Sequence, residues 1–202
     1  MKKLAKILAL LILGTGSLAQ AATWEIDPAH SAAQFSARHL MISNVRGEFS
    51  KVTGTLEWDG KNLGAAKLQS SIDVATLNTR EPKRDEHLKS PDFLDAAKFP
   101  AITFTAKSFA KGGHGKLKVV GDLTLHGVTK SVTLDVDGPS TEVKDPYGNT
   151  RIGASATTKI SRKDFGMTWN KALETGGVLV GDELTITLDI ELIRKAAPAA
   201  TK

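Results

Sequence analysis

The sequence contains no cysteine. The chain therefore cannot form a disulfide, and it cannot be anchored to a membrane through an acylated cysteine. A tetrahedral zinc site would need histidine and carboxylate ligands brought together from distant segments. Because no H-x-H or H-x-x-x-H pair occurs, we expect no metal site. The histidines are His30, His39, His87, His114 and His126.

Signatures of catalysis are also missing. No serine lies in a G-x-S-x-G elbow, and the carboxylates mostly occupy polar strand faces and turns. Ser31 lies close to Asp27 and His30, but "DPAHS" is also typical of a turn in which Asp27 or Ser31 binds backbone amides. We expect no catalytic residue, and we expect that the protein is not an enzyme.

Long apolar runs are absent except at the start, "MKKLAKILALLILGTGSLAQA". Three lysines precede the apolar run Ile7–Leu13, and the small residues Ala19 and Ala21 follow it. This pattern predicts a secretory signal over residues 1–21, cleaved after Ala21 or Ala22, and export to a periplasm of the Gram-negative kind. The run is shorter than the ~20 residues of a membrane span, so no transmembrane segment is expected after signal removal.

The charges exclude one class of partner. The chain has 27 Lys and Arg against 22 Asp and Glu, and three of the lysines lie in the leader, which leaves 27 − 3 = 24 basic residues and a net charge of 24 − 22 = +2. These charges are interspersed, so the basic stripe of a nucleic-acid-binding protein is absent.

Alternation of apolar and polar residues with a period of two recurs after the leader, which is typical of half-buried strands. The clearest example has Leu184, Ile186, Leu188, Ile190 and Leu192 on one face. Gly, Pro and Asn turn signals separate the alternating segments. We predict strands over residues 24–27, 31–40, 44–58, 67–75, 101–109, 116–126, 128–136, 150–160 and 183–192.

One segment between two predicted strands is helical instead. In "KRDEHLKSPDFLDAAKFP" and the residue before it, Pro82 suits a first helical position, and 82–89 can form two turns. Ser90 followed by Pro91 predicts a second short turn of helix over 92–97. Many long strands with one short helical insertion in about 180 residues favour an all-β sandwich or a closed antiparallel barrel of about eight strands.

Five segments, in order, resemble the motifs of the YceI-like family of periplasmic polyisoprenoid-binding proteins. They are "TWEIDPAHSAAQFSARHLMISNVRGEF", "KRDEHLKSPDFLDAAKFPAITF", "VVGDLTLHGVTKSVTL", "SATTKISRKDFGMTWN" and "LVGDELTITLDIEL". The resemblance implies an extended, lipocalin-like barrel over residues 23–193, whose apolar pore holds a long isoprenoid or a similar amphiphile. We expect residues 194–202 to form a flexible tail.

The motifs do not name ligand contacts, so we choose candidates by strand face and position. We expect the pore to be lined by Phe35, Ala37, Phe49, Ile72, Phe93, Leu94, Ile102, Phe104, Leu123, Leu125, Leu134, Phe165, Met167, Trp169, Ile186 and Leu188. For the loop 161–170 two interpretations stay open, an apolar lid with a polar rim and a hydrophobic plug that closes the barrel.

A second set of residues could contact the head group of an amphiphile: His39, Arg84, Asp85, His87, Arg162 and Asp164. His39 could equally be a satisfied core residue. Arg84 could pair with Asp85 or Asp92 and only brace the helical insertion as a cap on the barrel.

These observations favour a carrier or reservoir for a polyisoprenoid or an isoprenoid-quinone-like lipid, monomeric or homodimeric, with bound lipid in place of a cofactor. Two alternatives remain open. One is an enzyme or accessory factor that modifies an isoprenoid with His39, Arg84, Asp85 and His87 at the pore mouth. The other is a stress-responsive barrel whose cavity is incidental.

Overall fold

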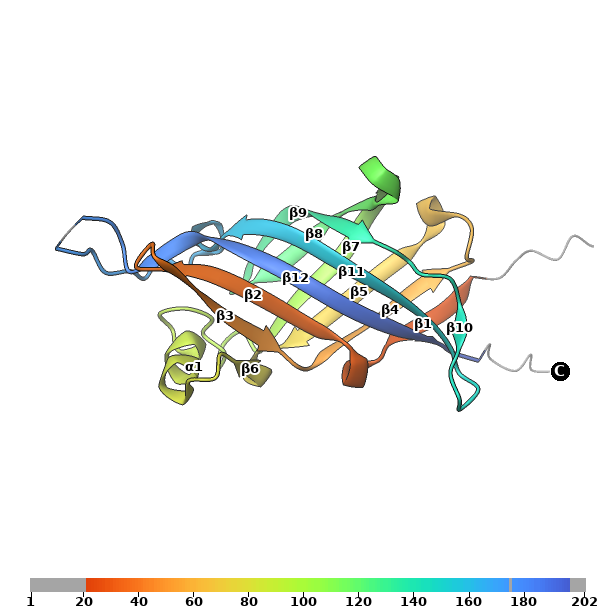
Figure 1. Ribbon diagram of the computed structural model, residues 1–202, viewed down its shortest axis with the longest axis horizontal. Coiled ribbons are helices and arrows are strands. Elements are labelled where there is room, and N and C mark those ends of the chain that lie inside the picture. The colour runs from red at the N-terminus through yellow and green to blue at the C-terminus, as the bar shows by residue number, and fades with distance from the viewer. Residues whose placement is uncertain (1–20, 175, 197–202) are drawn as a thin grey trace, which may run out of the picture.

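The structure is a computed structural model that describes residues 21–174 and 176–196 (Figure 1). The predicted leader lies outside the described residues except for Ala21, as does the tail from residue 197. The described residues form one antiparallel sheet of twelve strands: β1 (Ala22–Ile26), β2 (Ala32–His39), β3 (Ser43–Phe49), β4 (Val52–Trp58), β5 (Lys67–Asp73), β6 (Leu77–Asn78), β7 (Ala101–Lys111), β8 (Leu117–Leu125), β9 (Val128–Asp137), β10 (Val143–Lys144), β11 (Thr150–Ser161) and β12 (Val180–Arg194).

Helical structure is confined to short segments in the described part of the chain. They are one α-helix, α1 (Pro82–Lys89), and five 3₁₀ turns: η1 (Pro28–His30), η2 (Leu63–Ala65), η3 (Val74–Thr76), η4 (Gly113–Gly115) and η5 (Arg162–Phe165). None of these helices is long and apolar enough to cross a membrane.

The sheet closes on itself where β11 pairs with β12, from Arg151 opposite Ile193 to Ser161 opposite Glu183. The other edge of β12 pairs first with β2 and then, beyond η1, with β1. In the same way β3 pairs with β2, and β4 pairs with β1. Counting β1 with β2 and β3 with β4 as two interrupted strands, and leaving out the two-residue strands β6 and β10, the barrel has eight strands, which confirms the predicted fold.

Two local predictions are wrong. The strand predicted over 44–58 is broken at Ser50 and Lys51, because β3 continues toward β6 while β4 turns to pair with β5. The second short helix predicted over 92–97 is a series of turns. The segment cannot continue as a helix at Asp95, because this residue has a left-handed φ of 45°. The N–H of Asp95 donates to the carbonyl of Ser90.

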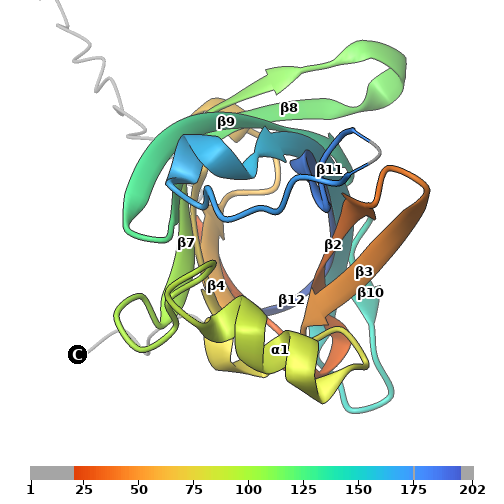
Figure 2. The same cartoon turned by 90° about the vertical axis from the view of Figure 1, so that its left-hand side faces the viewer.

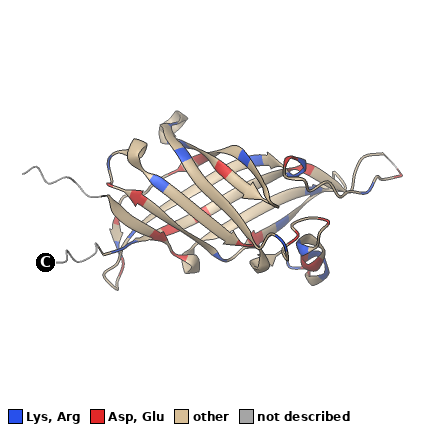
Figure 3. Cartoon of the chain, turned by 180° about the vertical axis from the view of Figure 1, so that it is seen from behind, with Lys and Arg blue, Asp and Glu red and all other residues tan. Residues whose placement is uncertain are grey.

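The two ends of the barrel differ. One end, which we call the α1 end, carries α1 and the loop that follows η5 (Figure 2). The described ends of the chain lie at the opposite end, which we call the termini end (Figure 1). Lys, Arg, Asp and Glu are interspersed along the strands (Figure 3), and the core lies inside the barrel.

The hairpin between β2 and β3 turns through two residues in the left-handed region, Leu40 with φ 51° and Met41 with φ 62°. Side chains with a Cβ are strained there, and glycine is not. Because Met41 is 49% exposed, its removal sacrifices only part of the burial that a core methionine would lose. We expect Met41→Gly to raise the free energy of unfolding by about 0.5–1 kcal/mol in urea denaturation.

The adjacent Ile42 is the control, since it is exposed and its φ is not positive. Ile42→Gly should lower the free energy of unfolding, because glycine there only adds entropy to the unfolded chain. If both variants are destabilised alike, the left-handed turn is not a source of strain.

Candidate functional site

A narrow apolar cavity of about 210 Å³ runs along the inside of the barrel. Among the described residues, none that lines it is charged. Its wall comes from η2 and all eight strands. The lining residues are Ile26, Ala33, Gln34, Phe35, Phe49, Val52, Leu56, Trp58, Leu63, Leu68, Ser70, Ile72, Ile102, Thr103, Phe104, Phe109, Leu117, Val119, Leu123, Leu125, Val132, Leu134, Val136, Pro139, Ile152, Ala154, Ala156, Thr158, Ile160, Ile186, Leu188, Ile190 and Leu192.

The wall is apolar because successive side chains of a strand point to opposite faces of the sheet. On β12 the even-numbered residues from Ile186 to Leu192 line the cavity, whereas the exposed Asp189 lies on the outer face. Small residues keep the middle open: Ala156 on β11 lies opposite Leu188, and Gly121 on β8 leaves room for the ring of Phe104.

Ten of the sixteen predicted lining residues line this cavity: Phe35, Phe49, Ile72, Ile102, Phe104, Leu123, Leu125, Leu134, Ile186 and Leu188. The sequence interpretation missed others of the same strand faces, such as Ile190 and Ile152, although the period-two pattern marks them. The other six predicted residues lie outside the cavity lining: Ala37, Phe93, Leu94, Phe165, Met167 and Trp169.

Most of these six close the α1 end. Phe165 and Met167 are only 2% and 4% exposed and belong to the same core cluster as Leu125 and Ile160. Phe93 and Trp169 pack against each other with ring centroids 5.2 Å apart. Of the two interpretations of the loop 161–170, the packing favours a hydrophobic plug over a lid. We call Phe93, Phe165, Met167 and Trp169 the plug. Ala37 lies on β2 opposite Leu184, beyond Phe35 toward the hairpin.

Arg162 holds this plug in place. Its side chain is 2% exposed, and its N–H groups donate to the carbonyls of Gly181 (3.1 Å), Met167 (2.6 Å) and Trp169 (2.8 Å). The fourth hydrogen bond, of 2.9 Å, joins Nη2 to the carboxylate of Asp182. The guanidinium thus donates its hydrogen bonds to acceptors of the protein itself. This geometry does not support the prediction that Arg162 contacts a head group.

Arg84 and Asp85 also form hydrogen bonds within the protein. Their common partner is Thr79, which the sequence analysis did not identify. Thr79 is 2% exposed, and its hydroxyl accepts from Nε of Arg84 at 2.8 Å and donates to Asp85 at 2.5 Å. The carbonyl of Thr79 accepts from Arg84, and its N–H donates to Asp85. Arg84 therefore pairs with neither Asp85 nor Asp92, but it does brace the insertion.

His87 lies at the outer surface of the plug. Its ring meets Phe93 and Trp169 edge-on, with centroids 5.1 and 4.9 Å apart, and Nε2 lies 2.9 Å from a carboxylate oxygen of Asp92. Asp164 is exposed, and His39 is half-buried at the end of β2. None of the six predicted head-group residues is among those that line the cavity in the described chain.

A further anchor of the plug is His126, to which the sequence analysis assigned no role. It has φ 51° in the β8–β9 turn, and its Nδ1 lies 3.0 Å from the carbonyl oxygen of Phe165. Because a carbonyl only accepts, Nδ1 must carry the proton in this contact. The ring of His126 also packs edge-on against Phe99 at 5.1 Å.

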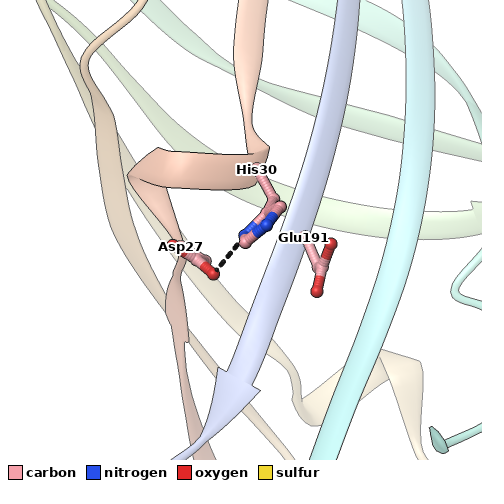
Figure 4. A group of neighbouring side chains, drawn as sticks. All are labelled: Asp27, His30 and Glu191. Atoms are coloured by element: carbon pink, nitrogen blue, oxygen red, sulfur yellow. Dashed lines mark hydrogen bonds and ion pairs between the residues drawn. The ribbon is translucent and has the colours of Figure 1, made fainter. Parts of the chain in front are cut away.

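Asp27, His30 and Glu191 lie together near the termini end, with ligand atoms within 4.8 Å of one another (Figure 4). Arg151 already supplies a positive charge here. Its Nη1 lies 2.6 Å from both carboxylates, and its Nε bonds to Asp145. This donor set is a hydrogen-bonded ion-pair cluster around a guanidinium, and we assign no metal to it.

The cluster shifts the pKa of its members. The hydrogen bond from Arg151, with a second from His30, lowers the pKa of the Asp27 carboxyl from 3.8 to about 2. Arg151 and Asn149 hold the pKa of Asp145 well below its usual range. Asp27 also accepts from the N–H of Ala29, and Ser31 Oγ accepts from the N–H of Glu191. The segment "DPAHS" therefore forms a turn in which Asp27 and Ser31 bind backbone amides.

The fold and cavity define a class of protein, the closed antiparallel barrels that enclose an apolar internal site. Within that class, the YceI-like domain model matches residues 24–192, and the chain belongs to this family. A UPF0312 protein of Staphylococcus aureus is 36% identical over 165 residues, covering 82% of this chain and 94% of the relative. A UPF0312 protein of Vibrio vulnificus is 38% identical over 157 residues, covering 77% and 82%.

Solved structures agree with the fold. The Campylobacter jejuni YCEI protein is 34% identical, with a TM-score of 0.65 over 79% of this chain and 90% of its own. BcnA of Burkholderia cenocepacia has a TM-score of 0.69 at 23% identity, covering 82% and 98%. A polyisoprenoid binding domain from Saccharophagus degradans has a TM-score of 0.63 at 16% identity, covering 87% and 100%. The last two show similarity of fold alone.

Arg162 provides a test of the plug with a built-in control. Arg162→Met removes a buried charge that satisfies three carbonyls and Asp182, so we expect the free energy of unfolding to fall by about 3–5 kcal/mol. The neighbouring Lys163 also pairs with Asp182, at 2.8 Å, but is 49% exposed. Lys163→Met should change stability by less than about 1 kcal/mol. Similar losses for both variants in urea denaturation would contradict the anchoring role of Arg162.

The Asp27 cluster predicts a pH dependence of stability. The folded pKa of Asp27 is lowered, so its contribution is complete above pH 3.8 and is lost as the pH falls toward about 2. We therefore expect Asp27→Asn to flatten the decline in melting temperature over this pH window, and to lower the melting temperature at pH 7. Glu86→Gln, at an exposed carboxylate with no ion pair among the described residues, is the control. Parallel curves for Asp27→Asn and the wild type would contradict the assignment.

Proposed function

We propose that this protein binds a long-chain amphiphile, a polyisoprenoid or an isoprenoid-quinone-like lipid, in the cavity of its barrel. The observation that carries the proposal is the shape and chemistry of that cavity. It is narrow, it follows the barrel from η2 and Trp58 to Ile160, and its described wall carries no charge. A thin, flexible, apolar chain fits such a site better than a compact polar ligand does.

The energetics favour a lipid chain. Each methylene that leaves water contributes about 0.8 kcal/mol. Loss of translational freedom and ordering of the chain offset an estimated 4–15 kcal/mol or more, so a chain of tens of carbons is needed for tight binding. The polyisoprenoid binding domain from Saccharophagus degradans, which shares the fold, supports this ligand class.

We further propose that binding serves transport or storage and not catalysis. Three of the polar residues that an isoprenoid-modifying enzyme would need have partners within the protein. Arg84 and Asp85 bind Thr79, and His87 contacts Asp92. Bound lipid takes the place of a cofactor in this proposal. The leader predicted from the sequence supports export to the periplasm, where the protein acts as a monomer or a homodimer.

The proposal is tested by purifying the protein with its own leader from the periplasm, extracting it with organic solvent and analysing the extract by mass spectrometry. A stoichiometric prenyl species is the expected result. An extract without lipid, from protein that also fails to take up added geranylgeraniol, would overturn the binding function. Lipid bound in protein recovered only from the cytoplasm would overturn the periplasmic role alone.

A matched pair of variants on β11 tests the cavity itself. Ala156 lines the cavity, and the adjacent Ser155 is exposed on the outer face. We expect Ala156→Phe to fill the middle of the cavity and reduce the retained lipid at least about tenfold, at a stability cost of about 1–3 kcal/mol. Ser155→Phe should retain lipid as the wild type does. Equal retention by the two folded variants would show that the ligand binds elsewhere.

A further inference from the structure

The polar groups at the α1 end are already satisfied by the protein. Arg162 makes two hydrogen bonds to the plug and two to β12, and Thr79 connects Arg84 to Asp85. The residues between these groups and the cavity are apolar and buried, with Phe165 at 2% and Met167 at 4% exposure. An amphiphile whose polar end approached this end would leave its oxygen against hydrocarbon, which is costly.

The termini end has the opposite character. Trp24 on β1 is 0% exposed, and Trp58 at the end of β4 lines the cavity. The indole Nε1 of each is buried and has no hydrogen-bond partner among residues 21–174 and 176–196. Buried donors are almost always paired in native proteins, so each needs an acceptor from a ligand or an ordered water. Both indoles lie at the same end, since Trp24 is opposite Leu56 on β4, two residues from Trp58.

Arg194 adds a cation to this end. It lies opposite Trp24 on β12, at the next inward-facing position after the lining residue Leu192. Its guanidinium stacks over the Trp24 ring, 4.6 Å from the centroid, and pairs with Glu142. Unlike Arg162, its side chain is 38% exposed. Leu63 and Pro139, which also line the cavity, are half-buried in loops at this same end.

We propose that the bound amphiphile has a fixed orientation, with its oxygen-bearing polar end at the termini end beside Trp24, Trp58 and Arg194, and its apolar tail against the plug at the α1 end. The chain then enters and leaves between the Leu63 and Pro139 loops. The inference rests on the proposed function. It names the polar site of that cavity and assigns to the indole N–H groups and Arg194 a hydrogen-bond acceptor on the ligand.

The three tryptophans report on this orientation. Trp169→Phe leaves emission from Trp24 and Trp58 at the termini end, and the difference between the wild type and this variant gives the emission of Trp169 at the α1 end with both indoles of the polar site in place. The probes are two forms of geranylgeraniol, with a nitroxide quencher next to the hydroxyl or at the far end of the chain. Circular dichroism checks that each variant is folded.

We expect the hydroxyl-end nitroxide to quench Trp24 and Trp58 more strongly than Trp169, and the far-end nitroxide to do the reverse. The opposite pattern, or equal quenching of both ends by each probe, would overturn the fixed orientation while leaving lipid binding intact. Absence of quenching together with absence of a geranylgeraniol complex in native mass spectrometry would overturn the proposed function itself.

A second measurement isolates the donor. Trp58→Phe removes the indole N–H and keeps an aromatic ring in the wall. Affinity for geranylgeraniol should fall about fivefold, the equivalent of one neutral hydrogen bond. Affinity for the matched hydrocarbon without the hydroxyl should stay unchanged. An equal loss for both ligands would assign Trp58 to packing alone and overturn its polar role.

Discussion

The pairing of β11 with β12 is the constraint on which the rest of the structure depends. This ladder closes the sheet, and closure gives every strand one face that points inward and one that meets solvent. The alternating sequence of β12 is therefore sufficient to make a wall that is apolar inside and charged outside. The cavity is a consequence of closing such strands around small lining residues such as Ala154 and Ala156, while Gly121 makes room for the ring of Phe104.

The two ends of the barrel are closed by different chemistry. At the α1 end a buried arginine binds backbone carbonyls, and a threonine hydroxyl connects Arg84 to Asp85. These bonds fix a plug of aromatic and sulfur-containing side chains. At the termini end Trp24 and Trp58 are packed side by side in the fold, but their indole N–H groups have no partner in the described part of the chain. The polar groups of the α1 end are paired within the protein, whereas the two indole N–H groups of the termini end are not paired among the described residues. This difference gives an otherwise uniform apolar cavity a direction.

Charged residues in this protein stabilise the outside of the barrel. Arg151 connects the β1–β2 break to β11 and β12 through Asp27, Glu191 and Asp145. A strand that is interrupted by η1 loses ladder hydrogen bonds at the break, and this cluster holds both halves on β12. The cluster has the residue types of a metal site, yet the guanidinium occupies the position that a cation would take.

The sequence by itself determined the strand faces, because a period of two is a local property that each strand displays alone, and it also marked the helix over 82–89. The pattern left a sandwich and a closed barrel open, and the resemblance to the YceI-like family implied the barrel. The sequence also identified ten lining residues, all of them on strands. Tertiary structure decided the roles of Arg162, Arg84 and Asp85, since their partners are backbone carbonyls and Thr79, which carry no signal in composition or spacing. It also decided that Phe165 and Met167 seal the barrel, because loop residues have no periodicity from which their direction can be read.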